Sequence, residues 1–103
     1  MIFGIDYDGT FARDPEFWEA FVPMAKIFGH ECVLVTGRSD SREFGDQVTR
    51  AVGALMPIVF AGSNWKREAA LKKGWRVDVW IDDNPEYVAE QSPIMRAALG
   101  REK

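Results

Sequence analysis

Short apolar runs alternate with amphipathic stretches along the whole chain. The runs at residues 1–5, 31–35, 57–61 and 76–81 are rich in apolar side chains, as is typical of strands that are covered on both faces. Between these runs, apolar residues recur every three or four positions, which indicates helices that bury one side. Strands and helices therefore alternate, and this predicts an α/β fold with a parallel sheet and right-handed crossovers.

Capping residues mark where the first two helices begin. Asp14 is a suitable N-cap, a proline follows it at the first helical position, and Gly29 ends this helix. Asp40 with Glu43 three residues later resembles a capping box. We therefore expect the second helix to begin at Asp40, with Phe44 on its apolar side.

The remaining predicted helices are shorter. A cap at Ser63 or Asn64 opens the third helix, which Gly74 ends. The Asn-Pro pair at 84–85 begins another short helix. A last turn or two is expected over 94–99, before a charged and frayed tail.

Length, charge and cysteine content exclude several classes of protein. The 103 residues are enough for one domain, 1–103, and the net charge of −3 gives no general signature of polyanion binding. The single Cys32 cannot form an internal disulfide, and its apolar strand predicts a packing role. No apolar run approaches the roughly 20 residues that span a bilayer, and the N-terminus lacks a leader pattern. We therefore expect a soluble, cytoplasmic protein with no membrane partner.

The most informative residues directly follow the first predicted strand. Asp6 and Asp8 flank a tyrosine, and Gly9 beside them permits a tight turn. Alone, this segment is equally typical of an acidic turn, because Asp and Gly are ordinary turn residues. Ligands in open α/β sheets bind outside the carboxyl ends of strands, so the two acids also stand where a site is expected.

Chemically suggestive groups follow the other three predicted strands as well. They are Thr36, then Lys66 at a helix start, then Asp82 and Asp83. Each has an ordinary structural use, as a strand-end hydroxyl, a solvated lysine or a turn. Parallel strands bring all four ends to one edge, where so many carboxylates repel each other unless a cation lies among them. Mg²⁺ takes oxygen ligands of this kind, together with waters and a substrate phosphate.

The order of these groups resembles that of the haloacid dehalogenase (HAD) superfamily phosphohydrolases. Residues 6–10 match the first motif of that family, Thr36 the second, Lys66 the third, and Asp82 with Asp83 the fourth. The resemblance covers nearly the whole chain. It implies a three-layer α/β/α, Rossmann-like domain with the strand order 3-2-1-4, and a Mg²⁺-dependent phosphomonoester hydrolase.

The resemblance also implies a role for each catalytic residue. Asp6 is the nucleophile that forms an aspartyl-phosphate, and Asp8 protonates the leaving oxygen and later deprotonates a water. Thr36 and Lys66 are the other two catalytic residues, and Lys66 neutralises the negative charge of the phosphoryl oxygens. Two further lysines at positions 72–73 are alternatives to Lys66, although they lie at the far end of the helix.

Binding residues follow from the same resemblance. The expected phosphate-binding residues are Asp8, Gly9, Thr36, Gly37, Arg38 and Lys66. For Arg38, an exposed arginine near a helix start is an equally reasonable interpretation. Mg²⁺ is expected to bind Asp6, the backbone carbonyl of Asp8, and Asp83. Asp82 is expected to orient water or the catalytic lysine, or to bind the metal as an alternative ligand.

No cap domain fits between the motifs, because one helix and one strand use up each of the segments 9–35 and 37–65, where larger relatives insert one. The site is therefore expected to be open. It suits either a large substrate, such as a nucleic-acid end or a phosphoprotein, or a small nucleotide or sugar phosphate covered by a second subunit of a homo-oligomer. The acidic chain slightly favours the small molecule.

Surface residues leave both choices of substrate open. A local basic rim would favour nucleic acid, and an apolar rim would favour an interface. The candidates for the basic rim are Arg13, Arg38, Arg42 and Arg67. The candidates for the apolar rim are Phe11, Trp18 and Trp65. Phe11 also stands where the HAD family usually has a smaller aliphatic residue, which is expected to reshape the entrance.

Two alternative functions remain beside the hydrolase. A phosphotransferase or phosphomutase would share Asp6, but transfer to an acceptor requires that water be excluded. A phospho-accepting receiver module also clusters acids, a threonine and a lysine, but its lysine comes last. Here Lys66 precedes Asp82 and Asp83, so the order of residues disfavours a receiver. Asp8 further argues for a phosphate ester, because the relatives that act on carbon–halogen bonds lack this acid.

Overall fold

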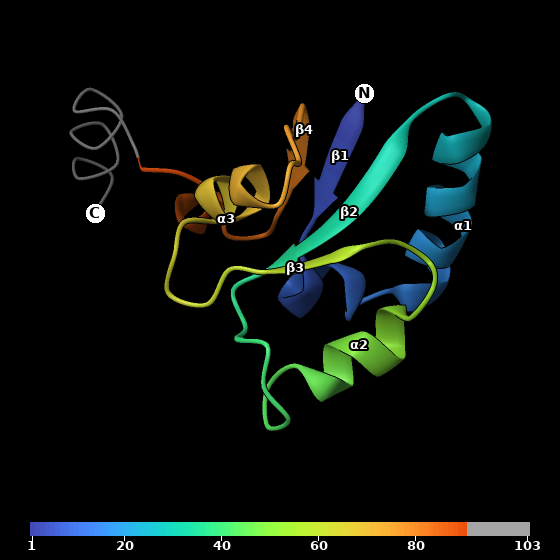
Figure 1. Ribbon diagram of the computed structural model, residues 1–103. Coiled ribbons are helices and arrows are strands. Elements are labelled where there is room, and N and C mark those ends of the chain that lie inside the picture. The colour runs from blue at the N-terminus through green and yellow to red at the C-terminus, as the bar shows by residue number, and fades with distance from the viewer. Residues whose placement is uncertain (91–103) are drawn as a thin grey trace, which may run out of the picture.

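The computed structural model describes residues 1–90, in which four strands form one parallel sheet (Figure 1). The strands are β1 (Ile2–Ile5), β2 (Glu31–Thr36), β3 (Ile58–Phe60) and β4 (Val79–Ile81). Their order is β3-β2-β1-β4, which confirms the predicted α/β class and strand order. The helical turns expected over 94–99 and the tail lie outside the described residues.

Helices cover both faces of this sheet (Figure 1). α1 (Pro15–Ile27) and α2 (Asp46–Val52) pack on one face, and α3 (Lys66–Lys72) packs on the other. A π-type turn, η1 (Tyr7–Phe11), follows β1, and a single 3₁₀ turn, η2 (Pro85–Tyr87), follows β4. This arrangement is the three-layer architecture that the alternating pattern predicts.

The central strand β2 supplies side chains to both hydrophobic cores. Cys32 and Leu34 point into the core under α1 and α2, whereas Val33 and Val35 point into the core under α3. All four side chains are buried, which explains why the apolar run is continuous. The thiol of Cys32 is free, in agreement with the predicted packing role.

Sheet register sets the position of the acidic residues. Ile5 of β1 pairs with Leu34 of β2 and with Ile81 of β4. Asp6 and Asp82 directly follow Ile5 and Ile81 in the chain. The two carboxylates therefore stand side by side at the carboxyl edge of the sheet.

The first helix begins and ends as predicted. The Asp14 carboxylate accepts a hydrogen bond from the backbone N–H of Phe17 at 3.4 Å. The helix ends at Ile27, and Gly29 follows with a φ of +84°, a conformation that glycine adopts without strain.

The second helix begins later than predicted. The expected capping box at Asp40 does not form, and α2 begins at Asp46. In the preceding turn, the Phe44 N–H donates to the Ser41 hydroxyl at 3.1 Å, and the Phe44 carbonyl accepts from Nη1 of Arg38 at 3.1 Å. Because side chains bind both backbone groups of Phe44, this residue stays outside the helix, and it is half exposed.

The helix α3 and the strand β4 also begin later than predicted. Neither Ser63 nor Asn64 caps α3, since Trp65 precedes the first helical residue and no side chain bonds the helix start. Gly74, with a φ of +87°, follows the helix as predicted. β4 is shorter than the predicted strand over 76–81.

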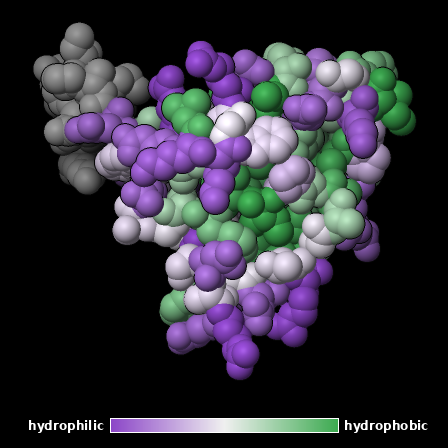
Figure 2. Space-filling model, viewed as in Figure 1, coloured by the Kyte–Doolittle hydropathy of each residue, from purple (hydrophilic) through white to green (hydrophobic). Residues whose placement is uncertain are grey.

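Apolar side chains of α1 remain exposed on its outer side. Phe17, Met24, Ile27 and Phe28 are each more than half exposed. Figure 2 shows hydrophobic residues at the corner where α1 passes into β2. Within residues 1–90, no helix is both long enough and apolar enough to cross a membrane.

Gly4 of β1 provides a test of the packing above the sheet. A β-carbon at this position would meet Cε3 of Trp80 and Cγ1 of Val77, each at 2.9 Å. Gly4→Ala should therefore lower the free energy of unfolding by about 1–3 kcal/mol, as overpacking does, in urea denaturation. Gly37→Ala is the control, because a β-carbon there has nothing within 4 Å. Equal losses in the two variants would contradict the packing argument.

Candidate functional site

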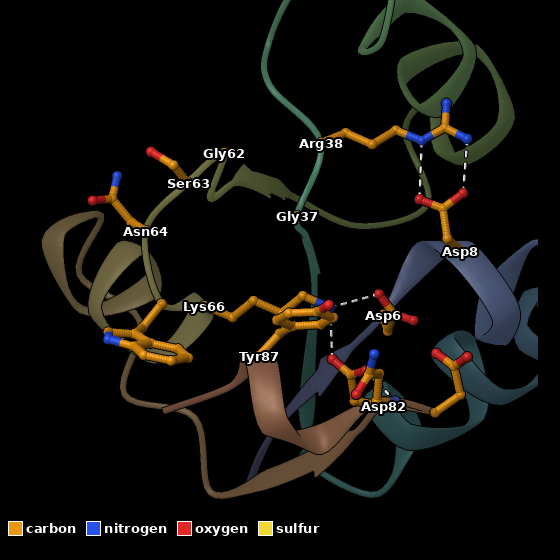
Figure 3. Close-up of a pocket in the computed structure, with 13 residues that line it drawn as sticks. Asp6, Asp8, Gly37, Arg38, Gly62, Ser63, Asn64, Lys66, Asp82 and Tyr87 are labelled. Atoms are coloured by element: carbon orange, nitrogen blue, oxygen red, sulfur yellow. Dashed lines mark hydrogen bonds and ion pairs between the residues drawn. The ribbon is translucent and has the colours of Figure 1, made fainter. Parts of the chain in front are cut away.

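A pocket of about 680 Å³ opens at the carboxyl edge of the sheet (Figure 3). This volume lies in the range of roughly 300–1,000 Å³ that small-molecule sites occupy. The lining residues come from the strand ends and the loops after them: Asp6, Asp8, Gly37, Arg38, Gly62, Ser63, Asn64, Trp65, Lys66, Asp82, Asp83, Asn84 and Tyr87. All the predicted site residues except Gly9 and Thr36 are among them.

A tight turn holds Asp6 at the base of the pocket. Its backbone N–H donates to the Ile81 carbonyl at 2.9 Å, and its carbonyl accepts from the Phe11 N–H at 3.1 Å. Gly9 has a φ of +80°, which this turn requires. Phe11 is fully buried and anchors the turn in the core. The prediction that Phe11 contributes to a rim or an entrance is therefore wrong.

Lys66 joins two of the acids inside the protein. Its Nζ donates to Oδ1 of Asp6 and to Oδ2 of Asp82, both at 2.6 Å (Figure 3). The Thr10 hydroxyl donates to the other oxygen of Asp6 at 3.2 Å. Lys66 is only 4% exposed and Asp6 only 5%. Both charges are therefore shielded from water, and each depends on the other for compensation.

Burial raises the pKa of the Asp6 carboxyl from 3.8 to about 6. The hydrogen bond from Lys66 opposes this shift, and the neighbouring carboxyls of Asp83 and Asp82 add to it. Burial by itself would lower the pKa of Lys66, but the bonds to Asp6 and Asp82 outweigh it and hold that pKa above 10.5. The three carboxyl groups of Asp6, Asp82 and Asp83 thus outnumber the single ammonium of Lys66 at this edge.

The arrangement of acids fits a divalent cation. One carboxylate oxygen from each of Asp6, Asp82 and Asp83 lies within 4.8 Å of the others. The Asp83 carboxylate packs directly on Gly9, where any β-carbon would overlap it. Oxygen donors with this excess of negative charge are what Mg²⁺ takes in proteins. The donor set thus fits the expected metal, with Asp82 already engaged by Lys66.

Asp8 points away from these acids and pairs with Arg38 (Figure 3). The guanidinium donates from Nε at 3.0 Å and from Nη2 at 2.7 Å to the two carboxylate oxygens. Its Nη1 donates to the Phe44 carbonyl at 3.1 Å and to Oε1 of Gln47 at 3.0 Å. The guanidinium carbon, Cζ, lies 5.2 Å from the centre of the Tyr7 ring. Arg38 therefore links the turn after β1 to the turn before α2.

Thr36 stands behind the pocket wall. It is fully buried, and its hydroxyl oxygen accepts the Arg38 backbone N–H at 3.2 Å. A hydroxyl that accepts one hydrogen bond still carries a proton to donate. Gly37, the next residue, lines the pocket directly. The structure therefore presents the second predicted motif to the pocket through Gly37 and holds Thr36 beneath it.

Other basic residues lie elsewhere. Among the arginines proposed for a basic rim, only Arg38 lines the pocket, and Asp8 neutralises it. Five basic residues considered from the sequence do not line the pocket: Arg13, Arg42, Arg67, Lys72 and Lys73. Lys66 is therefore the lysine of the site.

Two aromatic side chains extend the site beyond its charged groups. Trp65 lines the pocket and is 37% exposed, in line with its predicted place at a rim. Tyr87 also lines the pocket and is 60% exposed, although nothing in the sequence distinguishes it from an ordinary surface tyrosine. Trp18 instead packs against the core, and its Nε1 donates to the Thr10 carbonyl at 3.1 Å.

Comparisons of the chain with protein-family models, with curated proteins and with solved structures found no match.

The buried ion pairs predict a large effect of removing Lys66. In Lys66→Met, the carboxylates of Asp6 and Asp82 lose their shared cation inside the protein. The free energy of unfolding should fall by roughly 3–5 kcal/mol, as it does when one partner of a buried pair is removed. Lys72→Met, at an exposed position of the same helix, should leave it nearly unchanged in the same urea titration. Similar losses in both variants would contradict the buried pairing.

Proposed function

We propose that this protein is a phosphomonoester hydrolase of the HAD type that acts through an aspartyl-phosphate on Asp6. One observation carries the proposal. Asp6 lies at the base of an open pocket, and Lys66 and Thr10 hold its two carboxylate oxygens. A carboxylate fixed in this way is suited to in-line attack on a phosphorus atom.

The proposed reaction has two steps. A carboxylate oxygen of Asp6 attacks phosphorus, the bond from phosphorus to the leaving oxygen breaks, and Asp8, which has to be in its protonated form and apart from Arg38 at this step, gives that oxygen a proton. Asp8 then takes a proton from a water that attacks the phosphorus of the aspartyl-phosphate, and the bond from phosphorus to the Asp6 oxygen breaks. The products are an alcohol and inorganic phosphate, and both acids return to their starting states.

Asp8 must leave Arg38 to perform this role. The Asp8 side chain is 57% exposed, and the ion pair stands near the surface. Water screens such a pair, so separating it costs little compared with breaking the buried pairs of Asp6. Arg38, once free, is placed to meet the oxygens of an incoming phosphate, which a guanidinium can bind with two parallel hydrogen bonds.

Mg²⁺ is the cofactor that the proposal requires. Asp6, Asp83 and the backbone carbonyl of Asp8 would hold it, and when bound it would offset negative charge on the phosphoryl oxygens. Lys66 and the Gly37 backbone amide would contribute to the same stabilisation from the protein side.

The alternative functions are less well supported. A phosphotransferase or phosphomutase has to exclude water from the intermediate, whereas this pocket is open to solvent. In a receiver module the phosphorylated acid follows a later strand. Here the acid held by Lys66 is Asp6, which directly follows β1.

Substitution of the two acids tests the proposed chemistry. With p-nitrophenyl phosphate and Mg²⁺, Asp6→Asn should show no turnover, because an amide does not attack phosphorus. Asp8→Asn should lose roughly 10²–10⁴-fold in kcat, which is the usual contribution of a general acid–base. The phosphorylated protein should accumulate in Asp8→Asn and be visible by intact mass. Asp40→Asn, at an exposed acid outside the pocket, is the control, and wild-type turnover by Asp6→Asn would refute the mechanism.

Metal binding can be tested without any turnover. Mg²⁺ at a hundredfold excess over its dissociation constant should stabilise the wild type by about 2.7 kcal/mol, which thermal unfolding would register as a rise in Tm. Asp83→Asn should lose most of this rise, and Asp40→Asn should keep it. An undiminished rise in Asp83→Asn would remove that residue from the metal site.

A further inference from the structure

We infer that the pocket takes a nucleoside monophosphate, with the base against Trp65 and Tyr87 and the phosphate at Asp6. This inference rests on the proposed function, since it names the leaving group of the same reaction. The observation that supports it is a pair of exposed aromatic rings in a pocket whose cationic side chains suffice for a single phosphoryl group.

The two aromatic residues belong to neighbouring segments. The Arg67 N–H donates to the Val88 carbonyl at 2.7 Å, which ties the start of α3 to the end of η2. Trp65 lies two residues before Arg67, and Tyr87 lies one residue before Val88. Both side chains line the same pocket (Figure 3 labels Tyr87), and the two residues together are called the aromatic wall below.

This wall lies next to the reacting centre. Trp65 directly precedes Lys66, whose Nζ bonds Asp6, and adjacent Cα atoms are about 3.8 Å apart. Asp6 and the wall line one pocket of about 680 Å³, so a group attached through the ester oxygen of a phosphate at Asp6 shares that space with the two rings. A flat base on these rings would cover apolar surface that now faces water.

Neutral polar side chains complete the wall. Ser63, Asn64 and Asn84 line the pocket beside the two aromatic residues. The Asn84 side chain does not cap the turn that follows it, although it stands at the N-cap position. Hydroxyl and amide groups both donate and accept hydrogen bonds, which suits the edge of a base or a ribose. A purely hydrocarbon leaving group would gain nothing from these residues.

Charge limits the number of phosphates. Among the described lining residues, the only cationic side chains are Lys66 and Arg38. Lys66 is shared by two carboxylates, and Arg38 is paired with Asp8. Lys66 and Arg38 would both be needed to bind the first phosphate. No cationic lining side chain would therefore be left for a second phosphate or for the backbone of a nucleic acid. The pocket is suited to a monophosphate.

The test compares a nucleotide with a phosphate ester that has no ring. Adenosine 5′-monophosphate and glycerol 2-phosphate are hydrolysed in parallel by the wild type, Trp65→Ala, Tyr87→Ala and Tyr87→Phe. The ratio of kcat/KM for the nucleotide to kcat/KM for glycerol 2-phosphate should fall roughly five- to a hundredfold in each alanine variant, as for the loss of one stacking ring. The fall should come from a higher KM for the nucleotide. Tyr87→Phe should retain most of the ratio. Phe28→Ala, an exposed aromatic residue outside the pocket, should leave both rates unchanged.

A binding measurement separates this inference from the proposed function. Calorimetry with Asp6→Asn and adenosine 5′-monophosphate should show binding that weakens by a similar factor when Tyr87→Ala is added. If the wild type hydrolyses none of the phosphate esters but this binding is observed, the proposed function is refuted and the nucleotide site is supported. Hydrolysis of glycerol 2-phosphate with a ratio that neither alanine variant changes would overturn the inference alone. Faster hydrolysis of glucose 6-phosphate or of a phosphotyrosine peptide than of the nucleotide would also overturn it.

Discussion

The ammonium of Lys66, held between the carboxylates of Asp6 and Asp82, is the contact on which the rest of the site depends. It joins the ends of β1 and β4 to the first residue of α3. No side chain caps that helix, so the two ion pairs and the backbone bond from Arg67 to Val88 fix where it starts. Because these charges are buried, they are costly to leave unpaired, and the three elements have to meet in one geometry.

The two ion pairs of the site differ in how freely they can separate. The Asp6 pair is buried, and that carboxylate also accepts the Thr10 hydroxyl, so the proposed nucleophile has little freedom. The Asp8 pair with Arg38 stands near the surface, where water replaces a lost contact at small cost. A fixed nucleophile with a movable acid suits a reaction in which Asp8 must serve first the leaving oxygen and then a water.

The sequence predicts the sheet well because burial on both faces leaves continuous apolar runs, as in residues 32–35 of β2. It also predicts which residues meet at the carboxyl edge, since parallel strands end there together. It fails at α2, because the capping pattern at Asp40 is local, whereas the groups that bind Phe44 include Arg38, six residues earlier in the chain. The pairing of Arg38 with Asp8, 30 residues away, leaves no local signal at all. Tyr87 gives none either, because only the placement of η2 brings it to the pocket.

A core without a cap has to obtain its selectivity from its own loops. In the hydrolase that we propose, polar groups at the strand ends bind the phosphate, which every phosphate ester shares, so they do not distinguish one substrate from another. For such an enzyme, discrimination has to come from surface that contacts the leaving group, and the large aromatic side chains that line this pocket are Trp65 and Tyr87. In the free protein, exposed rings of this size leave apolar surface in contact with water, which is unfavourable. A ligand that covers the rings removes this surface from water and gains that free energy on binding. In the proposed enzyme, the loops after β3 and β4 thereby provide the contact surface for the leaving group within this one domain.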